Sequence, residues 1–220
     1  KSLKLRVTSK LSASSFKLFL VASYGKIIPK DIFDIPEHKT LNIHPSLLPK
    51  HRGASPIQSQ ILNDDRDVGV SLMLIDEEMD HGPILAQKKI ELEKWPIGRI
   101  ELEKILAVEG ARIFSHYYKE WLVGAIDPVM QNEEDSTYCT KIEKEDGRLD
   151  IDLDNLEKDA WENLLKIKAY EGWPGTYFLH QNKRVIIKDA QIVEDKLKLL
   201  RVLPEGKKEM GFEDYMRGVR

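Results

Sequence analysis

The chain has 220 residues and a formal net charge of -3, with 41% hydrophobic and 32% charged residues. These proportions are typical of a folded globular protein and exclude a disordered or fibrous chain. A protein held to nucleic acid mainly by its overall field would be basic, so composition alone does not indicate RNA or DNA binding. The single cysteine, Cys139, excludes an internal disulfide and a Cys-rich zinc site. It favours a reducing compartment such as the cytoplasm, and we expect Cys139 to be a half-buried strand residue.

The ends and apolar runs of the chain bear on membrane targeting. No apolar stretch reaches the roughly 18 residues of a membrane-spanning helix, so we expect no membrane association. The N-terminus begins Lys1-Ser2-Leu3-Lys4, which lacks an initiator Met and is not followed by the apolar core of a signal peptide. We therefore expect the chain to begin inside a longer gene product.

Short strands and turns are expected first. Residues 17–23, KLFLVAS, form an apolar run of strand length, as in a covered strand of a parallel sheet. Residues 31–35 predict one helical turn that ends at Pro36. Residues 41–44 predict a second strand, and the prolines that follow, Pro45 and Pro49, prevent its continuation.

A longer series of elements follows. Ser55 and Pro56 predict the N-cap and first position of a helix that runs to about residue 63. Residues 68–75 and 84–90 predict two more strands. Residues 97–123 predict the longest helix, since apolar residues recur there at steps of three and four.

Strands that alternate with helices predict an α/β layer with a mainly parallel sheet. A doubly wound domain usually begins with a strand-helix-strand unit. Here residues 3–8 are the one strand candidate before residue 17. We therefore expect an N-terminal portion of the domain to be missing.

The pattern changes toward the C-terminus, which predicts a second domain. We expect residues 1–124 to form the first domain, residues 125–136, with Pro128 and an acidic run, a linker, and residues 137–220 the second domain. In the second domain, residues 160–169 predict a short amphipathic helix. Three short strands are expected after it, at residues 176–179, 184–192 and 196–203. Short strands separated by polar turns predict a small β-barrel or an open sheet.

The segment 42–53, NIHPSLLPKHRG, has the highest density of chemically useful side chains. Asn42 and His44 are two residues apart at the end of a predicted strand, so both side chains project from one strand face. Sites in open α/β sheets form outside the carboxyl ends of strands. An amide can donate a hydrogen bond to a developing oxyanion, and a neutral imidazole can take a proton near neutral pH.

A carboxylate is often needed to orient such an imidazole. Asp80 is the best candidate, because it lies in the glycine-containing turn Met79-Asp80-His81-Gly82-Pro83 between two predicted strands. From the residues alone it competes with Asp76, Glu77 and Glu78. A metal site of His44, His51 and Asp80 is the alternative reading, but a His pair seven residues apart across two prolines has no standard ligand geometry.

Three separated segments, NIHPSLLP, HRGASPIQ and GVSLMLIDEEMDHGPIL, resemble the signature of the folate-dependent formyltransferases. That family has an Asn-x-His pair followed by Ser-Leu-Leu-Pro, and an Asp 36 residues after the His. Here Asp80 follows His44 by 80 − 44 = 36 residues. The Arg-Gly-Ala-x-Pro-Ile stretch resembles the methionyl-tRNA and amino-sugar branches of the family. The resemblance implies a Rossmann-like formyltransferase domain.

The resemblance also implies a mechanism with 10-formyltetrahydrofolate as formyl donor to a primary amine. Asn42 and His44 stabilise the tetrahedral oxyanion in this scheme, His44 assists proton transfer, and Asp80 orients His44 or an ordered water. Ser46, Leu47, Leu48 and Pro49 shape the folate pocket. Arg52 has two open readings, as a partner of the folate glutamate or a tRNA phosphate, or as a solvated loop residue.

His51 stands where the family usually has an aromatic residue, and we expect a surface side chain there.

Segments near the C-terminus resemble the tRNA-holding domain of the methionyl-tRNA branch. They are residues 141–147, 173–176 and 204–210. Residues 183–208 also contain eight Lys or Arg and four Asp or Glu, an excess of a kind that can contact an RNA backbone. The implied partner is initiator methionyl-tRNA, the implied product serves translation initiation, and the family suggests a monomer.

Two departures stand beside this resemblance. Lys168 replaces an Arg that is frequent in the family. The family's first strands and a loop that contacts the tRNA acceptor arm lie upstream of Lys1.

Two other functions are weighed against formylation of methionyl-tRNA. One is formylation of an amino sugar nucleotide, against which the C-terminal segments argue. The other is a truncated product that binds folate or RNA without turnover.

Overall fold

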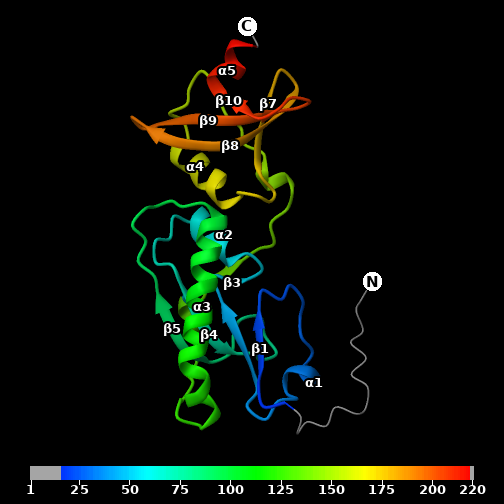
Figure 1. The fold of residues 1–220 in the computed structure, drawn as a ribbon, viewed down its shortest axis with the longest axis vertical. Helices are drawn as coiled ribbons and strands as arrows, with labels where there is room; N and C mark the ends of the chain where they lie inside the picture. The colour runs from blue at the N-terminus through cyan, green and yellow to red at the C-terminus, as the bar shows by residue number, and fades with distance from the viewer. Residues whose placement is uncertain (1–15, 219–220) are drawn as a thin grey trace. The chain divides into compact units, whose positions relative to one another are not determined.

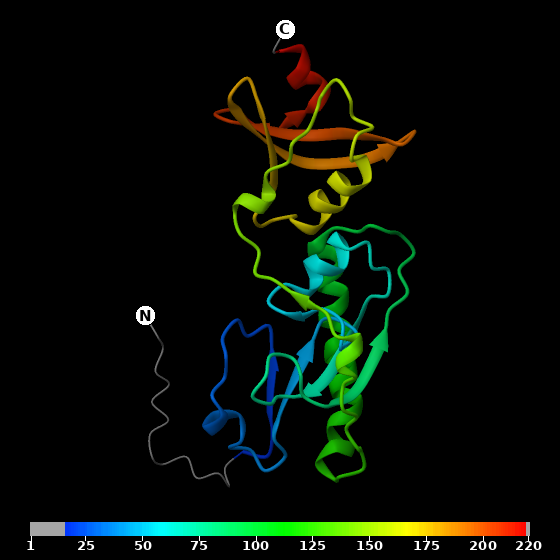
Figure 2. The same cartoon turned by 180° about the vertical axis from the view of Figure 1, so that it is seen from behind.

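The structure is a computed structural model that describes residues 16–218 (Figures 1 and 2). The chain divides into two compact units. The first comprises the chain up to Gly53, Gly69–Ile90 and Leu106–Tyr138, and the second comprises Ala54–Val68, Glu91–Ile105 and the chain from Cys139 onward. The strand expected at residues 3–8 lies outside the described residues. The division into domains at residues 1–124 and 137–220 stays a prediction.

The first unit is built on a four-stranded sheet with the order β1-β2-β4-β5. Its strands are β1 (Phe19–Ala22), β2 (Thr40–His44), β4 (Gly69–Leu74) and β5 (Ile84–Lys89). Each agrees with a predicted strand to within two residues. Together with helix α3 (Arg99–Leu122), they confirm the predicted α/β class (Figure 1).

The direction of the strands differs from the mainly parallel sheet that we predicted. β1 and β2 are parallel, but β4 runs antiparallel to both β2 and β5. The short loop from Ile75 to Pro83 explains the last pairing, because parallel neighbours need a crossover of a dozen or more residues. An apolar run such as that of β4 reports burial on both faces and does not report strand direction.

Helix α3 covers one face of strand β2. Leu106 and Ile113 of α3 are buried. A Cβ atom built on Gly110 would lie 2.6 Å from Ile43 Cγ2, so the missing side chain allows a close approach of helix and strand. Because side chains alternate along a strand, Asn42 and His44 project from the face opposite to Ile43. The short helix α1 (Lys30–Phe33) lies between β1 and β2 in the sequence.

The second unit contains a four-stranded antiparallel sheet with the order β10-β9-β8-β7. Its strands are β7 (Thr176–His180), β8 (Lys183–Val193), β9 (Lys196–Pro204) and β10 (Met210–Gly211), and its helices include α4 (Ala160–Ala169). Leu164 and Ile167 of α4 share a core with Phe178, Val185 and Leu199 of the sheet. The predicted strands and helix are confirmed, while closure of the sheet into a barrel stays a prediction.

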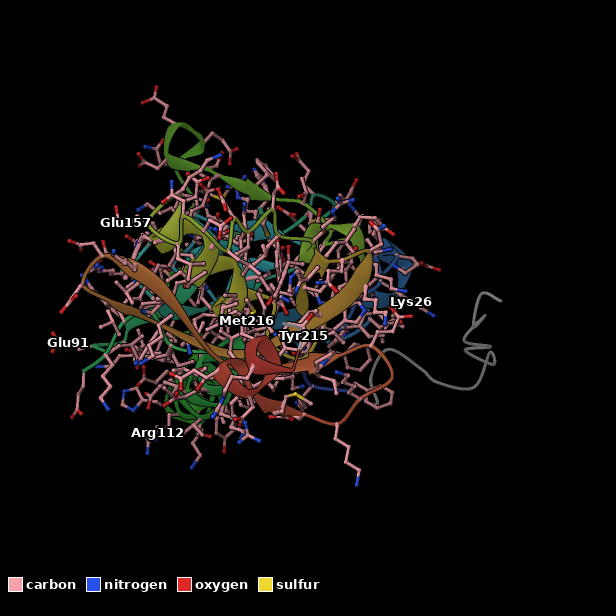
Figure 3. All side chains as sticks on the ribbon, turned by 90° about the horizontal axis from the view of Figure 1, so that it is seen from above. Lys26, Glu91, Arg112, Glu157, Tyr215 and Met216 are labelled. Atoms are coloured by element: carbon pink, nitrogen blue, oxygen red, sulfur yellow. The ribbon has the colours of Figure 1, made fainter. Side chains whose placement is uncertain are left out.

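The C-terminal helix α5 (Phe212–Arg217) was not predicted from the sequence. Tyr215, labelled in Figure 3, is buried in the core of the second unit. Its hydroxyl group forms a hydrogen bond of 2.9 Å with His180 Nδ1. The helix therefore packs against the antiparallel sheet.

Helix α2 (Pro56–Leu62) also belongs to the second unit and begins where we predicted. Ser55 stands at the N-cap, but its side chain does not cap the helix. Its hydroxyl instead donates to the carbonyl oxygen of Thr140. After the helix, Asp64 accepts hydrogen bonds from the indole groups of Trp95 at 2.6 Å and Trp161 at 3.1 Å. Asp64 therefore ties α2 to α4.

Residues 125–136, which we expected to form a linker, are part of the first unit. The backbone groups of Val129 and Ile84 exchange hydrogen bonds of 2.8 and 2.9 Å. Gln131 is buried, and residues Glu133–Asp135 form a 3-10 turn, η2. This segment leads to β6 (Tyr138–Cys139), which forms a two-stranded sheet with β3 (Arg52–Gly53). Cys139 is half-buried in a strand, as predicted.

Candidate active site

Strand β2 places two of the predicted site residues on one face. His44 is 3% exposed and is the last residue of the strand. Asn42 is half-buried two positions earlier. Strand β4 lies beside β2 and pairs Met73 with Asn42 and Ser71 with His44. Both polar side chains are therefore held by a strand with a hydrogen-bonded neighbour on each side.

Asp80 reaches this face from the loop between β4 and β5. Its Oδ1 atom lies 3.6 Å from His44 Nδ1 and 3.5 Å from Asn42 Nδ2. Its Oδ2 atom accepts a hydrogen bond of 2.8 Å from the backbone N–H of Gly53. The structure thus brings together the three residues that the sequence singled out as a catalytic group.

The other three carboxylates that competed with Asp80 are directed elsewhere. Asp76 forms a hydrogen bond of 2.6 Å with His81 Nδ1. This hydrogen bond is the main cause of the raised pKa of His81. Glu77 contacts the ammonium group of Lys30, and Glu78 is exposed. Asp80 is therefore the carboxylate that faces the imidazole of His44.

The contacts of His44 define which nitrogen is free to accept a proton. Nε2 lies 3.0 Å from the carbonyl oxygen of His51, and a carbonyl oxygen can only accept, so Nε2 carries hydrogen. In the neutral imidazole, Nδ1 then has the lone pair and faces Asp80. Burial lowers the pKa of His44, and the Asp80 carboxylate and the His51 carbonyl act in the opposite direction. His44 is thus suited to accept a proton as a neutral base at pH 7. The Asp80 carboxylate lies next to Nδ1, the nitrogen that would receive the proton.

Residues 46–49, which we expect to line the folate pocket, are bound through their backbone by Ser71 and Gln87. Neither of these two residues was predicted from the sequence. Ser71 Oγ donates to the carbonyl oxygen of Ser46 at 2.7 Å and accepts from Leu48 N at 3.0 Å. Gln87 Nε2 donates to the carbonyl oxygen of Leu48 and to Ser71 Oγ, both at 2.8 Å. The signal for Ser71 was a lone polar residue within the apolar run of β4.

The remainder of this segment has its own contacts. Ser46 Oγ donates to the carbonyl oxygen of Lys50 at 2.6 Å. Leu48 is buried, whereas Leu47 and Pro49 are half-buried. A backbone whose polar groups are satisfied by buried partners keeps one conformation, so the loop is a preformed surface beside the cluster of Asn42, His44 and Asp80.

Two expectations about the end of the loop are wrong. We predicted a surface position for His51, but it is 5% exposed. Arg52 is fully buried, so neither reading of it, as a partner of folate or tRNA phosphate or as a solvated residue, agrees with the structure. Its guanidinium forms a bidentate pair with Glu133 at 2.7 and 3.0 Å and lowers the pKa of that carboxyl. The partner lies 81 residues further along the chain, which explains why the sequence did not reveal it.

Residues 16–218 contain no group of three or more His, Cys, Asp or Glu side chains placed to hold a metal ion. Across the same residues, no helix combines the length and the apolar character needed to cross a membrane.

Several known proteins are similar to this chain. Residues 3–96 match the family model described as formyl transferase. The methionyl-tRNA formyltransferase of Thermodesulfovibrio yellowstonii is 33% identical over 230 residues, which cover 95% of this chain and 72% of that protein. The chain belongs to the methionyl-tRNA formyltransferase family. A second member of the family, from Sulfurihydrogenibium sp., is 38% identical over 181 residues, which cover 82% of this chain and 56% of the relative.

Solved structures of formyltransferases share the fold. The structure of methionyl-tRNA formyltransferase from Clostridium thermocellum has a TM-score of 0.62 and 20% identity, and the match covers 86% of this chain and 77% of that one. A sugar N-formyltransferase from Shewanella has a TM-score of 0.65 and 22% identity, with coverage of 83% and 73%. At these identities the likeness concerns the fold, and it confirms the predicted formyltransferase architecture.

Proposed function

We propose that this protein transfers a formyl group from 10-formyltetrahydrofolate to the α-amino group of initiator methionyl-tRNA. The observation that carries the proposal is the cluster of Asn42, His44 and Asp80, in a chain of the methionyl-tRNA formyltransferase family. The product, formylmethionyl-tRNA, serves translation initiation. The protein would act in the cytoplasm as a monomer.

The chemistry begins with attack of the neutral amine on the formyl carbon. A new C–N bond forms, and the carbonyl oxygen becomes an oxyanion that accepts a hydrogen bond from Asn42 Nδ2. A fixed donor of this kind stabilises the transition state because its dipole already points at the developing charge. An α-amino group has a pKa of about 8, so a substantial part of the acceptor is neutral near pH 7 without a strong base.

The proton of the attacking amine then moves to the ring of His44. Nδ1 is the acceptor, since Nε2 is committed to the carbonyl oxygen of His51 at 3.0 Å. Asp80 Oδ1, at 3.6 Å, lies beyond direct hydrogen-bonding distance but stabilises the imidazolium charge. When the bond between the formyl carbon and N10 of the folate breaks, the proton passes from Nδ1 to N10. His44 is then neutral again.

The loop of residues 46–49 would line the folate pocket. Its support from Ser71 and Gln87 keeps the backbone in place before the donor binds. Preorganisation of this kind reduces the entropy lost on binding. The formyl group would then lie beside Asn42 and His44, which precede the loop in the sequence.

The antiparallel sheet of the second unit supplies candidate contacts for tRNA. Lys183, Lys188 and Lys198 of β8 and β9 are exposed. Lys196 and Arg201 form ion pairs with Glu157 and Glu209 at 2.8 and 2.9 Å. Exposed lysines can contact phosphates without base specificity, and binding by such contacts weakens as salt rises.

The acceptor is tested with labelled 10-formyltetrahydrofolate and a choice of amines. We expect label to appear on methionyl-tRNA and not on an amino sugar nucleotide. Label on the amino sugar alone would replace the proposed acceptor and keep the reaction. If neither acceptor is labelled, the proposed activity is wrong, and a thermal melt with folate or tRNA then tests the non-enzymatic binding reading.

A further inference from the structure

The side-chain amide of Gln131 is connected to the loop that carries Asp80. Gln131 is 8% exposed. Its Nε2 atom donates to the carbonyl oxygens of Asp80 at 2.9 Å and Gly82 at 2.8 Å. Its Oε1 atom accepts from Arg52 Nε at 3.0 Å. Both amide hydrogens and the amide oxygen are thus engaged in a buried site.

The partners of Gln131 allow one orientation of its amide group. A backbone carbonyl has no hydrogen to donate, and an arginine has no lone pair to accept. A flipped amide would place its oxygen against two carbonyl oxygens and its NH₂ group against the guanidinium of Arg52. The orientation of the amide therefore follows from its neighbours.

Arg52 in turn is held firmly. Beside its bidentate pair with Glu133, its guanidinium donates to the hydroxyl of Tyr138 at 2.9 Å. The next residue, Gly53, donates its backbone N–H to Asp80 Oδ2 at 2.8 Å. Asp80 is therefore held at its backbone carbonyl by Gln131. Its carboxylate is held by the backbone N–H of Gly53, the residue that follows Arg52.

Asp80 needs such attachment because its backbone is strained. Its φ angle is +53°, in the left-handed region that residues with a side chain seldom adopt. A strained backbone of this kind costs about 1–3 kcal/mol and persists where the surroundings determine it. The side chain of an Asp in another backbone conformation would leave from the loop in another direction.

We propose that Gln131 is a positioning residue for the transfer reaction and acts through Asp80. The inference rests on the proposed function for its kinetic part only. Within residues 16–218, the hydrogen bonds of the Gln131 side chain go to Arg52, Asp80 and Gly82, and none goes to His44 or to the loop of residues 46–49. Its removal therefore affects the rate of transfer and leaves the affinity for the folate donor unchanged.

The test is a double-mutant cycle with Gln131→Leu and Asp80→Ala, measured as steady-state formyl transfer with varied folate donor. Gln131→Leu keeps the approximate volume and removes all three hydrogen bonds. We expect kcat to fall by about 10-fold to 100-fold with an unchanged KM for the folate donor, because small misplacements at a reacting centre have effects of this size. In the Asp80→Ala background, the same substitution should have no further effect.

A second measurement does not depend on activity. The imidazole nitrogens of His44 are titrated by NMR in the wild type and in both variants. Asp80 raises the pKa of His44. The pKa should therefore fall further in Gln131→Leu, and it should not change when Gln131→Leu is added to Asp80→Ala. If the wild type transfers no formyl group, the proposed function fails, and this titration alone decides about Gln131.

Two further variants separate positioning from loss of fold. Met130→Ala changes the preceding residue, whose side chain is 61% exposed, and it should leave both readouts unchanged. Should Gln131→Leu fail to fold, Gln131→Glu replaces it, since it keeps an oxygen toward Arg52 and loses the donors toward Asp80. A loss of equal size with and without Asp80, or an unchanged His44 pKa in a folded variant, would overturn the proposal.

Discussion

His44 and Ser71 lie directly opposite each other on the antiparallel strands β2 and β4. His44 faces Asp80, while Ser71 Oγ donates to the carbonyl oxygen of Ser46. One pair of strand residues thus places the imidazole and supports the loop that follows it. The strand pair β2–β4 therefore supports both the candidate base and the candidate folate pocket.

Substitution of Ser71 by Ala tests this shared support. The variant leaves Ser46 O and Leu48 N without their buried partner, and an unsatisfied buried group destabilises by about 1–3 kcal/mol. We expect KM for the folate donor to rise more than kcat falls, because the change lies under the loop and not at the cluster. Steady-state kinetics with varied folate measures it, and a loss confined to kcat would contradict the assignment of the loop.

Asn42→Ala removes the proposed oxyanion donor. Loss of one such donor reduces kcat by about 100-fold to 1000-fold. KM should change little, since the hydrogen bond strengthens only as charge develops on the oxygen. Steady-state rates at varied folate donor give both parameters, and an effect on KM alone would assign Asn42 to ground-state binding.

The buried His44 predicts a particular dependence of stability on pH. Burial lowers its pKa in the folded protein below the ordinary value of 6.5. Between the two values the unfolded chain binds more protons, so the free energy of unfolding decreases as pH falls from above 6.5 toward the folded pKa. We expect this decrease, which sets in as pH falls through about 6.5, to be smaller in His44→Gln than in the wild type.

Urea unfolding at several pH values provides the measurement for His44. His116→Gln is the matched control, because His116 is exposed on α3. The control should follow the wild-type curve. Identical pH profiles for His44→Gln and the wild type would show that the imidazole is not protected from protonation in the folded state.

Gly110→Ala addresses the packing behind the site. In an exposed helix, replacement of Gly by Ala stabilises by about 1 kcal/mol. Here the new Cβ would lie 2.6 Å from Ile43 Cγ2, and overpacking of this kind destabilises by about 1–3 kcal/mol. We therefore expect a lower melting temperature and, because Ile43 lies between Asn42 and His44, a lower kcat. A variant more stable than the wild type would contradict the close approach of α3 and β2.

The strands and main helices could be predicted from local sequence patterns. The apolar run of β4 and the three- and four-residue periodicity of α3 both led to elements close to those observed. The alternation of side chains along a strand predicted that Asn42 and His44 share one face. The resemblance to the formyltransferases was needed to favour a catalytic role for them over a turn-capping or core role. Asp80 was one of four carboxylates by position, and the spacing of the formyltransferase signature was needed to choose it.

Features that depend on distant parts of the chain could not be predicted. Arg52 was read either as a partner of folate or a tRNA phosphate or as a solvated loop residue. Its true partners, Gln131 and Glu133, are 79 and 81 residues away in the sequence. The antiparallel direction of β4 depends on the path of the loops that connect it to its neighbours. The amino-acid composition of the strand does not determine it. Ser55 stands at the predicted N-cap position, but its hydroxyl donates to the carbonyl oxygen of Thr140 and does not cap the helix.

The most direct test of the central claim is formyl transfer to methionyl-tRNA by the wild type and by His44→Ala in a single turnover. General acid–base catalysis contributes about 100-fold to 10,000-fold, so we expect the variant to be slower by a factor in that range while it still binds folate and tRNA. A His44→Ala variant that transfers the formyl group at the wild-type rate would contradict the account of the site.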